Sequence, residues 1–586
     1  MTDAGPESAM RDRWAPPANW PAVSHAKVRA MLTAPGQPFE METVAIAGRP
    51  TRVWKNAPPT LRAIVEASRA HGDTLCTIYR DERVSFEAGF RATAALARHL
   101  RECGITKGDR VALAMRNLPE WPVAFFAITA LGAICVPINA WWTAEELAFG
   151  LGDSGSKAII CDAERWDRVR EIRDNLPDLE TCIVSRAEAP LEGARRLEDI
   201  LGTSDAWANL PDQGLPPADI SPDDDATIFY TSGTTGNPKG ALGSHRSICT
   251  NVLSSKYNLA VAPLRRGEMP PEPEPKTVLL VIPLFHVTAC SAAMVGYFVS
   301  GHTMVFMHHW DAEEAMRIIE RERVNLTGGV PTVAWQLLDH PARGNYDLSS
   351  LELVTYGGAP AAPELVRRIH DEFGAAPGSG WGMTETMATV TGHVAEDYLN
   401  RPDSCGPPVA VADLKIMSLD GTRELPVGEV GELYAFGPMV AKGYWNRPDA
   451  TAESFIDGWM RTGDLARLDE EGFCYIVDRA KDMVIRGGEN IYSSEVENVL
   501  YEHPAVSDAA VIGLPHRQLG EEPAAVVHLA SGESASEAEL QEWVAARLAH
   551  FKVPVRIAFT DDTLPRNANG KILKKDLRGL FGVASG

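Results

Sequence analysis

The sequence predicts an α/β fold: a large N-terminal domain of α/β sheets packed with helices, followed by a small C-terminal α+β domain. From about residue 56 the chain alternates helical and strand-like patterns, which is typical of parallel or mixed sheets covered by helices. Near residue 478 charged residues and a Gly pair lead into a new helix and a second, smaller unit. We therefore expect an N-terminal extension (1–55), a large domain (56–480) and a C-terminal domain (481–586).

The elements of the large domain follow from their patterns. Residues 1–55 are Pro-rich and are expected to form an extended arm lying on the large domain. After them, "LRAIVEASRAHG" (61–72) and "FRATAALARHLRECG" (90–104) predict helices. The segments "CTIYRDERVSF" (76–86, with a turn), "RVALAMRN" (110–117) and "KAIICD" (157–162) predict strands.

One uncharged stretch, residues 121–142, is long enough to span a membrane. Pro122, Gly132 and Pro137 interrupt it, however. We therefore predict a buried helix that ends near Leu131, then a short strand at Ile134–Pro137, and no stable membrane insertion.

Three segments complete the chain. The Pro- and acid-rich stretches 203–224 and 267–276 are expected to be surface connections. In the C-terminal unit, "SDAAVIGLP" (507–515) and "EPAAVVHLA" (522–530) predict strands, and "EAELQEWVAARLAH" (537–550) predicts a helix.

Composition narrows the class of function. The chain has 586 residues, of which 45% are hydrophobic and 23% charged, as is ordinary for globular proteins. Its net charge of −23 argues against nucleic acid as a partner. The nine cysteines form no CxxC pair, and no apolar signal opens the chain, so a reducing, cytoplasmic location is expected. Metal binding by the doublet His308-His309 is not favoured.

The stretch "YTSGTTGNPKG" (230–240) carries the strongest chemical signal. It follows a strand-like run, 226–230, and precedes a helix-like pattern with Ser244 as a candidate cap. Small residues let backbone N–H groups and hydroxyls surround phosphate oxygens, and Lys239 adds a positive charge. The run does not match the Walker A pattern. A flexible turn is the alternative, but the strong bias towards Gly, Ser and Thr favours a phosphate loop.

This loop resembles the signature phosphate loop of the adenylate-forming superfamily, which includes acyl-CoA synthetases, adenylation domains of peptide synthetases and beetle luciferases. The other motifs follow in the family's order: "YGGAP" (356–360), "GWGMTE" (380–385), "RTGD" (461–464), "DRAKDMVIRGGEN" (478–490) and "PRNANGK" (565–571). The resemblance covers roughly residues 60–575 and favours the branch of AMP-dependent fatty-acid–CoA ligases. It implies ATP, Mg²⁺ and coenzyme A as cofactor and co-substrates, and a two-domain enzyme.

The resemblance also implies roles in the first half-reaction, in which a carboxylate attacks the α-phosphorus of ATP. Glu385 holds Mg²⁺, Thr384 lies beside the α-phosphate, and Lys571 stabilises the developing charge. Trp381 stands where relatives often have tyrosine, and either ring can stack on a purine. The candidate phosphate-binding residues are Thr231, Ser232, Gly233, Thr234, Thr235, Gly236 and Lys239. The candidate adenine- and ribose-binding residues are Gly358, Ala359, Pro360, Gly380, Trp381, Gly382, Asp464 and Arg479.

The resemblance also implies a second half-reaction, in which the thiol of coenzyme A displaces AMP. Before it, the C-terminal domain is expected to swing about Lys481, which removes Lys571 from the site and brings in the residues that form a path for the thiol. The residues of that path are Arg486, Gly487, Gly488 and Glu489. For the glycine pair the alternative is a tight turn.

The acyl pocket is expected to be lined by His286, Tyr356, Gly357 and Gly380. His286 in "PLFHVTAC" (283–290) matches a gate position of related CoA ligases; a satisfied core histidine is the alternative. No residue is recognised that would hold an α-amino group, which favours a fatty, aryl or alicyclic acid. Coenzyme A is the favoured acceptor, a separate carrier protein or an amine is the alternative, and a homodimer is an expectation from family habit.

Overall fold

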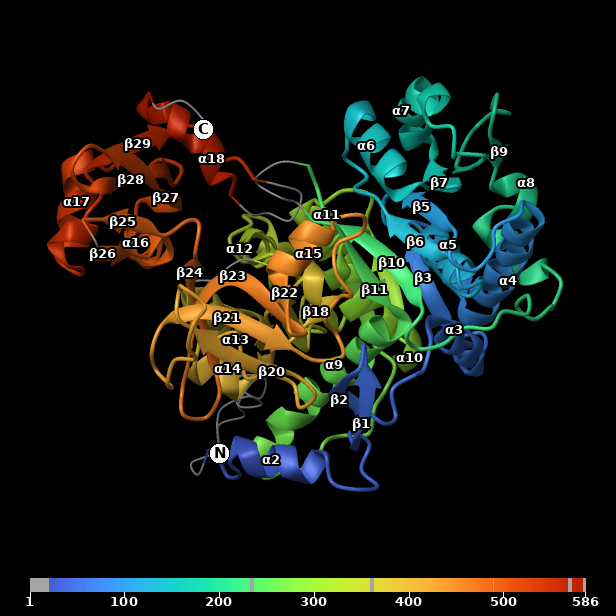
Figure 1. Ribbon diagram of the computed structural model, residues 1–586, viewed down its shortest axis with the longest axis horizontal. Helices are drawn as coiled ribbons and strands as arrows, with labels where there is room; N and C mark the ends of the chain where they lie inside the picture. Colours follow the sequence, from blue (N-terminus) through green and yellow to red (C-terminus); the bar gives the residue numbers. More distant parts are fainter. Residues whose placement is uncertain (1–19, 232–236, 359–362, 488, 567–571, 583–586) are drawn as a thin grey trace.

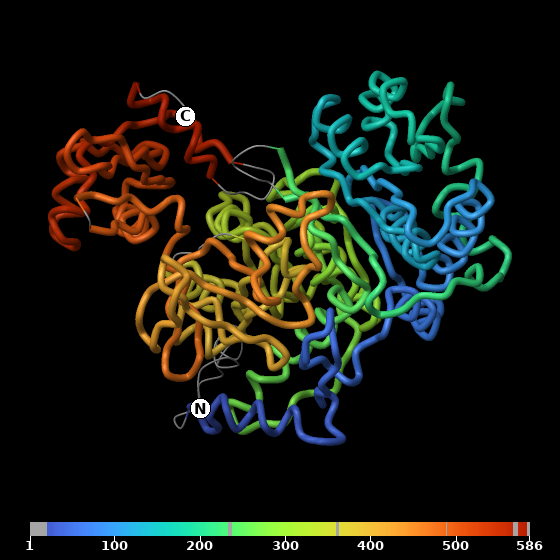
Figure 2. The backbone as a smooth tube through the Cα atoms, in the orientation of Figure 1, coloured from blue at the N-terminus to red at the C-terminus, as the bar shows by residue number. Residues whose placement is uncertain are grey.

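The computed structural model describes residues 20–231, 237–358, 363–487, 489–566 and 572–582. Figure 1 shows a large body of several sheets and a small unit, drawn in red, that lies to one side of it. Figure 2 shows that a single backbone segment near residue 480 leads from the large body into this unit. The small unit contains all described residues from 484 onward that form regular structure.

The first sheet of the large body is parallel except for one edge. Its antiparallel edge strand, β11, pairs with the strand that precedes the glycine-rich loop. The strand order is β11 (Gly240–Ser244), β10 (Asp225–Tyr230), β6 (Ile134–Pro137), β5 (Arg110–Ala114), β7 (Ala158–Asp162), β8 (Thr181–Ser185) and β9 (Arg195–Arg196). The associated helices are α4 (Phe86–Glu102), α5 (Glu120–Thr129), α6 (Ala144–Ser154), α7 (Ala163–Ile172) and α8 (Glu198–Leu201).

The second sheet is parallel over its six inner strands and antiparallel at both edges. Its order is β19 (His393–Val394), β16 (Ala376–Ser379), β15 (Leu353–Tyr356), β14 (Leu326–Gly329), β12 (Thr277–Leu280), β13 (Thr303–Phe306), β3 (Leu75–Tyr79) and β4 (Glu82–Ser85). The helices that accompany it are α3 (Leu61–Ser68), α9 (His245–Arg265), α10 (Val295–Ser300), α11 (Ala312–Glu322), α12 (Pro331–Leu338), α13 (Pro363–Phe373) and α14 (Glu396–Asn400).

One hydrophobic core joins the two sheets. Val111 and Leu113 of the first sheet share a buried cluster with Leu280 and Phe306 of the second. Helix α5 lies within this cluster and is buried at every position, because almost all its side chains are apolar. The predicted helix-then-strand reading of residues 121–142 is therefore confirmed, with the helix ending at Thr129. None of the helices in the described ranges is long and apolar enough to cross a membrane.

A third, antiparallel sheet closes the large body, and the small unit has a sheet of its own. The third sheet contains β20 (Asp413–Met417), β21 (Gly431–Phe436), β23 (Trp459–Leu468), β22 (Phe455–Ile456) and β24 (Cys474–Arg479), with α15 (Pro448–Ser454) beside it. The small unit contains β26 (Glu489–Ile491), β25 (Val484–Arg486), β28 (Gly520–Leu529), β27 (Val506–His516), β29 (Arg556–Thr560), α16 (Ser493–Tyr501), α17 (Glu537–Ala545) and α18 (Lys574–Leu577).

The N-terminal segment differs from the expected extended arm. Residues 20–55 contain a helix, α2 (His25–Leu32), and a hairpin of β1 (Met41–Ile46) and β2 (Arg49–Trp54). Ala47 and Gly48 at the turn both have positive φ, 47° and 78°, as a tight hairpin turn requires. The indole of Trp54 packs 5.5 Å from the ring of Tyr257 in α9, so the hairpin is part of the large body's core.

The loop region also differs from the expectation. The glycine-rich run does not lead directly into a helix, because β11 lies between them and pairs with β10. Ser244 is confirmed as the cap of α9, since its hydroxyl accepts the N–H of Ser247 at 3.1 Å. The next residue, His245, is fully buried, and its Nδ1 accepts the N–H of Leu61 at 3.2 Å. This bond fixes the start of α9 against α3.

His245 makes the stability of the large body depend on pH. Burial lowers the pKa of His245 from 6.5 to about 4. Above pH 6.5 the imidazole of His245 is neutral in both the folded and the unfolded state. Below pH 6.5 it is protonated in the unfolded chain but stays neutral in the folded chain, so the free energy of unfolding decreases as the pH falls towards 4. In His245→Gln, we expect the loss of unfolding free energy between pH 7 and pH 5 to be smaller by about 2 kcal/mol.

Urea denaturation at the two pH values measures this difference. The exposed His550, substituted in the same way, is the control and should leave the pH dependence as in the unmodified protein. Equal pH dependence in His245→Gln and in the unmodified protein would contradict the assignment.

Candidate functional site

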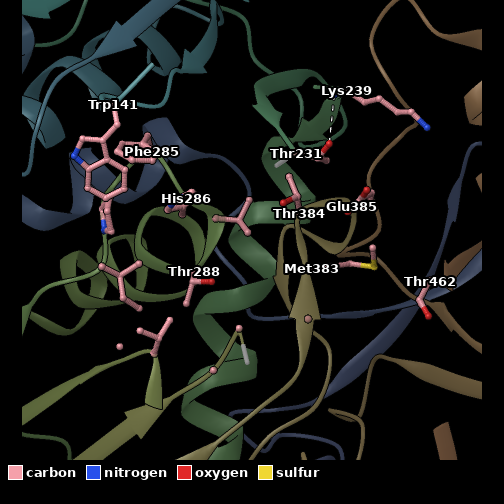
Figure 3. Close-up of a pocket in the computed structure, with 18 of the residues that line it drawn as sticks. Trp141, Thr231, Lys239, Phe285, His286, Thr288, Met383, Thr384, Glu385 and Thr462 are labelled. Atoms are coloured by element: carbon pink, nitrogen blue, oxygen red, sulfur yellow. Dashed lines mark hydrogen bonds between the residues drawn. The ribbon is translucent and has the colours of Figure 1, made fainter. Parts of the chain in front are cut away.

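A cavity of about 1000 Å³ opens where the strands of both parallel sheets end. Ligands of open α/β sheets bind at the carboxyl ends of the strands, where loops diverge. Here the loops that follow β5, β6, β10, β12, β13, β14 and β15 all contribute to the wall, and the third sheet closes the opposite side through residues 460–463. Figure 3 shows the side chains that surround this space.

The phosphate-loop end of the cavity is formed by Thr231 and Lys239. The N–H of Thr231 donates to the carbonyl of Lys239 at 2.9 Å. The N–H of Lys239 donates to the hydroxyl of Thr231 at 3.3 Å, which is the dashed line in Figure 3. These bonds close the neck of the loop. The remaining predicted loop residues, Ser232, Gly233, Thr234, Thr235 and Gly236, lie outside the described residues.

The predicted metal-binding carboxylate, Glu385, lies next to this end. Thr384 and Glu385 belong to a short 3₁₀ helix, Thr384–Thr386, and both line the cavity. The hydroxyl of Tyr444 donates to Glu385 Oε1 at 2.6 Å, and the ammonium of Lys239 lies 5.0 Å from the centre of the Tyr444 ring. Burial raises the pKa of Glu385, and the Tyr444 hydroxyl opposes that rise.

This arrangement fits Mg²⁺. Within the described residues no three His, Cys, Asp or Glu side chains form a metal-binding group. Mg²⁺ is commonly held by one or two carboxylates together with phosphate oxygens of a substrate, so a single buried carboxylate at the phosphate end meets its needs. Glu385 would hold the ion, which when bound supplies positive charge to phosphate oxygens.

Asp464 and Arg479 meet through the pairing of β23 with β24. Asp464 and Arg479 face each other in the register, and Nε of Arg479 lies 2.8 Å from Asp464 Oδ1. The indole N–H of Trp381 donates to the other oxygen, Oδ2, at 2.9 Å. Gly463 and Arg479 line the cavity, whereas Asp464 is buried and is not among the described lining residues, so the pair reaches the cavity through its arginine.

The adenine-binding candidates are only partly brought together. Gly358 and Gly382 line the cavity, whereas Ala359 and Pro360 lie outside the described residues. Gly382 is required by packing, because a Cβ there would lie 1.5 Å from the carbonyl oxygen of Ala388. Trp381 is absent from the cavity lining; its ring packs against two hydrophobic clusters, and its polar contact is with Asp464. The structure therefore favours a positioning role for Trp381.

The acyl-pocket candidates divide in the same way. His286 and Gly357 line the cavity, but Tyr356 and Gly380 are not among its described lining residues. Side chains alternate along a strand, and Tyr356 at the end of β15 points into the core, 5.8 Å from the ring of Tyr398. A Cβ at Gly380 would lie 2.6 Å from the carbonyl oxygen of Thr391, which explains the glycine there by packing.

His286 stands at the wall between the phosphate end and the aromatic end (Figure 3). Its ring lies 4.5 Å from that of Phe285, and burial lowers its pKa to about 3. Nε2 is buried and has no hydrogen-bond partner in the described part of the chain. His286 is therefore neutral at neutral pH, which suits a gate better than a proton acceptor and differs from a satisfied core histidine.

Of the described C-terminal candidates, Lys481 lines the cavity, whereas Arg486, Gly487 and Glu489 are not among its lining residues. Burial lowers the pKa of Lys481. Arg486, Gly487 and Glu489 belong to the β25–β26 hairpin, in which the N–H of Gly487 donates to the carbonyl of Leu519 at 2.7 Å. Gly488 and Lys571 lie outside the described residues. The thiol path and the swing about Lys481 stay predictions.

Sequence reasoning missed several residues of the site. Tyr444 follows a glycine in "KGYW", a pattern that gives little signal by itself. Trp141 ends the uncharged stretch 121–142, in which only a helix and a strand were predicted, yet it is 40% exposed and lines the cavity. Arg116, Asn237 and His308 line it too. Of these, Asn237 belongs to the glycine-rich run and Arg116 to the predicted strand 110–117, whereas no strand was predicted before His308.

The fold and the site define a protein that binds a nucleotide and a small acid, and comparison with known proteins identifies the family. The family model described as "AMP-binding enzyme" matches residues 64–445, and the model of the "AMP-binding enzyme C-terminal domain" matches residues 495–571. The chain belongs to this AMP-binding, adenylate-forming enzyme family.

Individual proteins similar to this chain belong to the same family. A feruloyl-CoA synthase from Amycolatopsis is 37% identical over 496 residues, which cover 84% of this chain and 93% of that protein. The long-chain-fatty-acid–CoA ligase FadD13 of Mycobacterium tuberculosis is 35% identical over 526 residues, covering 89% of this chain and 96% of the ligase. The crystal structure of the anthranilate CoA ligase AuaEII with anthranoyl-AMP superposes with a TM-score of 0.80 at 26% identity, covering 89% and 96% of the two chains.

The bond between Trp381 and Asp464 gives a prediction. Trp381→Phe keeps an aromatic ring but removes the N–H that holds Asp464 Oδ2, so one carboxylate oxygen is no longer oriented. A hydrogen bond to a charged group contributes about 1.5–3 kcal/mol, so KM for ATP should rise roughly tenfold. Steady-state kinetics with varied ATP measures the effect.

Trp459→Phe is the matched control, because Trp459 lies on the same strand as Asp464 and is not among the cavity's lining residues. Its KM for ATP should equal that of the unmodified protein. An unchanged KM for ATP in Trp381→Phe would show that Asp464 does not need this donor.

Proposed function

We propose that the protein activates a carboxylic acid with ATP, giving an acyl-adenylate and pyrophosphate, and then transfers the acyl group to coenzyme A with release of AMP. The observation that carries this proposal is one cavity with three kinds of wall. Lys239 and Glu385 supply charge at one end, the Asp464–Arg479 pair lies beside them, and His286 with the aromatic Phe285 and Trp141 forms the other end.

The first half-reaction depends on positioning and on neutralising charge. Lys239 would contact the terminal phosphates, and Thr384 would donate a hydrogen bond near the α-phosphorus. Glu385 would hold Mg²⁺ against phosphate oxygens, with Tyr444 fixing the orientation of its carboxylate. Asp464 would accept hydrogen bonds from the ribose hydroxyls, with Trp381 and Arg479 fixing the orientation of its carboxylate.

The second half-reaction needs a thiol to reach the acyl carbonyl. We propose that Lys571 serves adenylation and that the C-terminal domain, residues 481–586, then swings about Lys481. The hairpin of β25 and β26 carries Arg486 and Glu489, and Gly487 at its turn has φ = 61°, which glycine adopts without strain. A backbone of this kind lets a narrow pantetheine arm pass close to the chain.

For the acid, we propose a fatty, aryl or alicyclic carboxylic acid without an α-amino group. The cavity wall around His286 is formed largely by apolar side chains, among them Val281, Ile282, Val330 and Val333. A feruloyl-CoA synthase and a long-chain-fatty-acid–CoA ligase are both relatives of this chain, which supports an aryl or a fatty acid equally.

A separate carrier protein or an amine is the alternative acceptor. We also propose a cytoplasmic location, supported by nine cysteines that are all free. A homodimer stays an expectation from family habit.

Incubation with ATP, Mg²⁺ and a panel of carboxylic acids, with and without coenzyme A, tests the function. Pyrophosphate release and acyl products are followed together. AMP and an acyl-CoA are expected for a subset of acids. An acyl-adenylate that forms but does not react with coenzyme A would overturn the acceptor in favour of a carrier or an amine, and no acid-dependent pyrophosphate would overturn the whole proposal.

The division of labour between the domains gives a second kinetic prediction. Lys571→Ala should lower acid-dependent pyrophosphate release by roughly 100-fold or more, because it removes a charge that stabilises the developing oxyanion. Formation of acyl-CoA from supplied acyl-adenylate should be largely retained.

Lys575→Ala, four positions further on, is the control and should retain both half-reactions. Equal loss of both half-reactions in Lys571→Ala would reject the swing of the C-terminal domain.

A further inference from the structure

One carboxylate behind the phosphate end of the cavity, that of Asp153, stands in an unfavourable position. It lies in the last turn of α6, where the helix dipole disfavours a negative charge, and this turn contains no basic residue. The side chain is only 9% exposed, so its carboxylate is also largely removed from water. Both conditions cost free energy unless hydrogen bonds and an opposite charge compensate for them.

Two segments distant in sequence supply that compensation. The hydroxyl of Tyr230 donates to Asp153 Oδ2 at 2.7 Å, and Nη2 of Arg447 lies 2.5 Å from Asp153 Oδ1. The backbone carbonyl of Asp153 accepts hydrogen bonds from the indole N–H of Trp445 and from the side-chain amide of Asn446, both at 3.2 Å. Asp153 therefore joins the end of β10 and the segment 445–447 to α6.

Tyr230 lies at the base of the glycine-rich loop. It is the last residue of β10 and pairs with Gly240, the first residue of β11, so these two residues flank the loop. The next residue, Thr231, is bonded to Lys239, and both line the cavity. Burial, and then the hydrogen bond to Asp153, raise the pKa of Tyr230, so its hydroxyl stays a donor at neutral pH. Asp153 thus holds the base of the loop against α6.

Arg447 ends the segment that carries Tyr444. The N–H of Arg447 donates to the carbonyl of Tyr444 at 3.2 Å, which closes a turn between the two residues. The hydroxyl of Tyr444 in turn orients Glu385, the carboxylate that fits Mg²⁺. Backbone pairing with β11 holds one end of this segment, and Asp153 holds the other. A displaced Arg447 would therefore shift the donor that fixes Glu385.

We infer that Asp153 is a positioning residue for the phosphate and metal end of the cavity, because it holds the loop base and the Tyr444 segment at a fixed separation. The inference rests on the proposed function, which places ATP and Mg²⁺ at this end. Asp153 is not among the described lining residues, so it acts through Tyr230 and Arg447. A displacement of about 1 Å at reacting groups can cost roughly 100-fold in rate, so such support matters.

A purely structural anchor is the alternative, and the two roles predict different measurements. Loss of a structural anchor lowers stability and affects the binding of ATP and of the acid alike. Loss of a positioning residue affects ATP and Mg²⁺ alone. The apolar wall around His286 belongs to loops that follow β12 and β14, and none of the Asp153 bonds described above reaches those loops.

Binding of ATP by Asp153→Asn tests the inference. Asparagine keeps the shape and one oxygen acceptor but removes the charge that pairs with Arg447. Calorimetric titration with ATP, with Mg²⁺ and with a chelator in its place, gives the two Kd values. We expect the Kd with Mg²⁺ to rise about tenfold and the Kd without Mg²⁺ to rise less, because outer partners of metal-binding groups contribute roughly 10–100-fold. The KM for the carboxylic acid should stay as in the unmodified protein.

Two further variants assign the effect to the two contacts. Arg447→Gln should raise the Kd for ATP with Mg²⁺ as much as Asp153→Asn does, and the double variant should show no further rise, since both changes remove one ion pair. Tyr230→Phe removes the other contact and should weaken ATP binding equally with and without Mg²⁺. If Asp153→Asn does not fold, these two single variants carry the same comparison between ATP and acid.

Glu313→Gln is the matched control. Glu313 also accepts a tyrosine hydroxyl, from Tyr346 at 2.7 Å, and lies 3.5 Å from an arginine, Arg317, but it is not among the described lining residues. Its Kd values for ATP should equal those of the unmodified protein.

Two results would overturn the inference while the proposed function stands: unchanged Kd values in folded Asp153→Asn, or a KM for the acid that rises by the same factor as the Kd for ATP. If the unmodified protein binds no ATP, the proposed function fails, and the inference fails with it.

Discussion

The site depends on the backbone pairing of one short edge strand, β11. On one side it forms the antiparallel hairpin with β10 that closes the glycine-rich loop. On its other side Leu242 exchanges backbone hydrogen bonds with the 442–443 segment, and the N–H of Trp445 donates to the carbonyl of Gly240 at 2.7 Å. Gly243 permits a close approach of Met387, whose sulfur would lie 2.4 Å from a Cβ at that position. Three segments distant in sequence are thereby held at one edge.

This constraint explains how the charged groups of the site support one another. The same edge carries Lys239 at the end of the loop, Tyr444 in the paired segment and Glu385 in the turn before Met387. The N–H of Ala441 donates to the carbonyl of Glu385 at 2.8 Å, so the turn is tied to the segment that carries Tyr444. A buried carboxylate is costly unless it is hydrogen-bonded, and the hydroxyl of Tyr444 meets that need from a rigid position. Lys239 over the ring of Tyr444 completes the group.

Many of the helices, strands and caps could be predicted from the sequence, because they depend on residue patterns within a few positions. The apolar run of α5, the strand β6 and the cap at Ser244 were predicted because periodicity and capping act within a few residues. What the sequence could not show are contacts set by sheet order. Strand β11 is rich in glycine and alanine and lacks a strand pattern, and Tyr444 joins the site only because that strand pairs with its segment. Tyr356 shows the converse, since a motif residue at the end of a strand faces the core.

The two ends of the cavity impose different physical demands, and His286 divides them. At the loop end two cations, Lys239 and Arg479, stand with two carboxylates, Glu385 and Asp464, and hydrogen bonds from Tyr444 and Trp381 orient those carboxylates. At the other end, Arg116 lies over the ring of Trp141. Its neighbouring carboxylates, Asp162 and Glu164, already form ion pairs with Arg165. One cavity therefore has a charge-balanced end beside the glycine-rich loop and, beyond His286, an end at which the guanidinium of Arg116 has no anionic partner among the described residues.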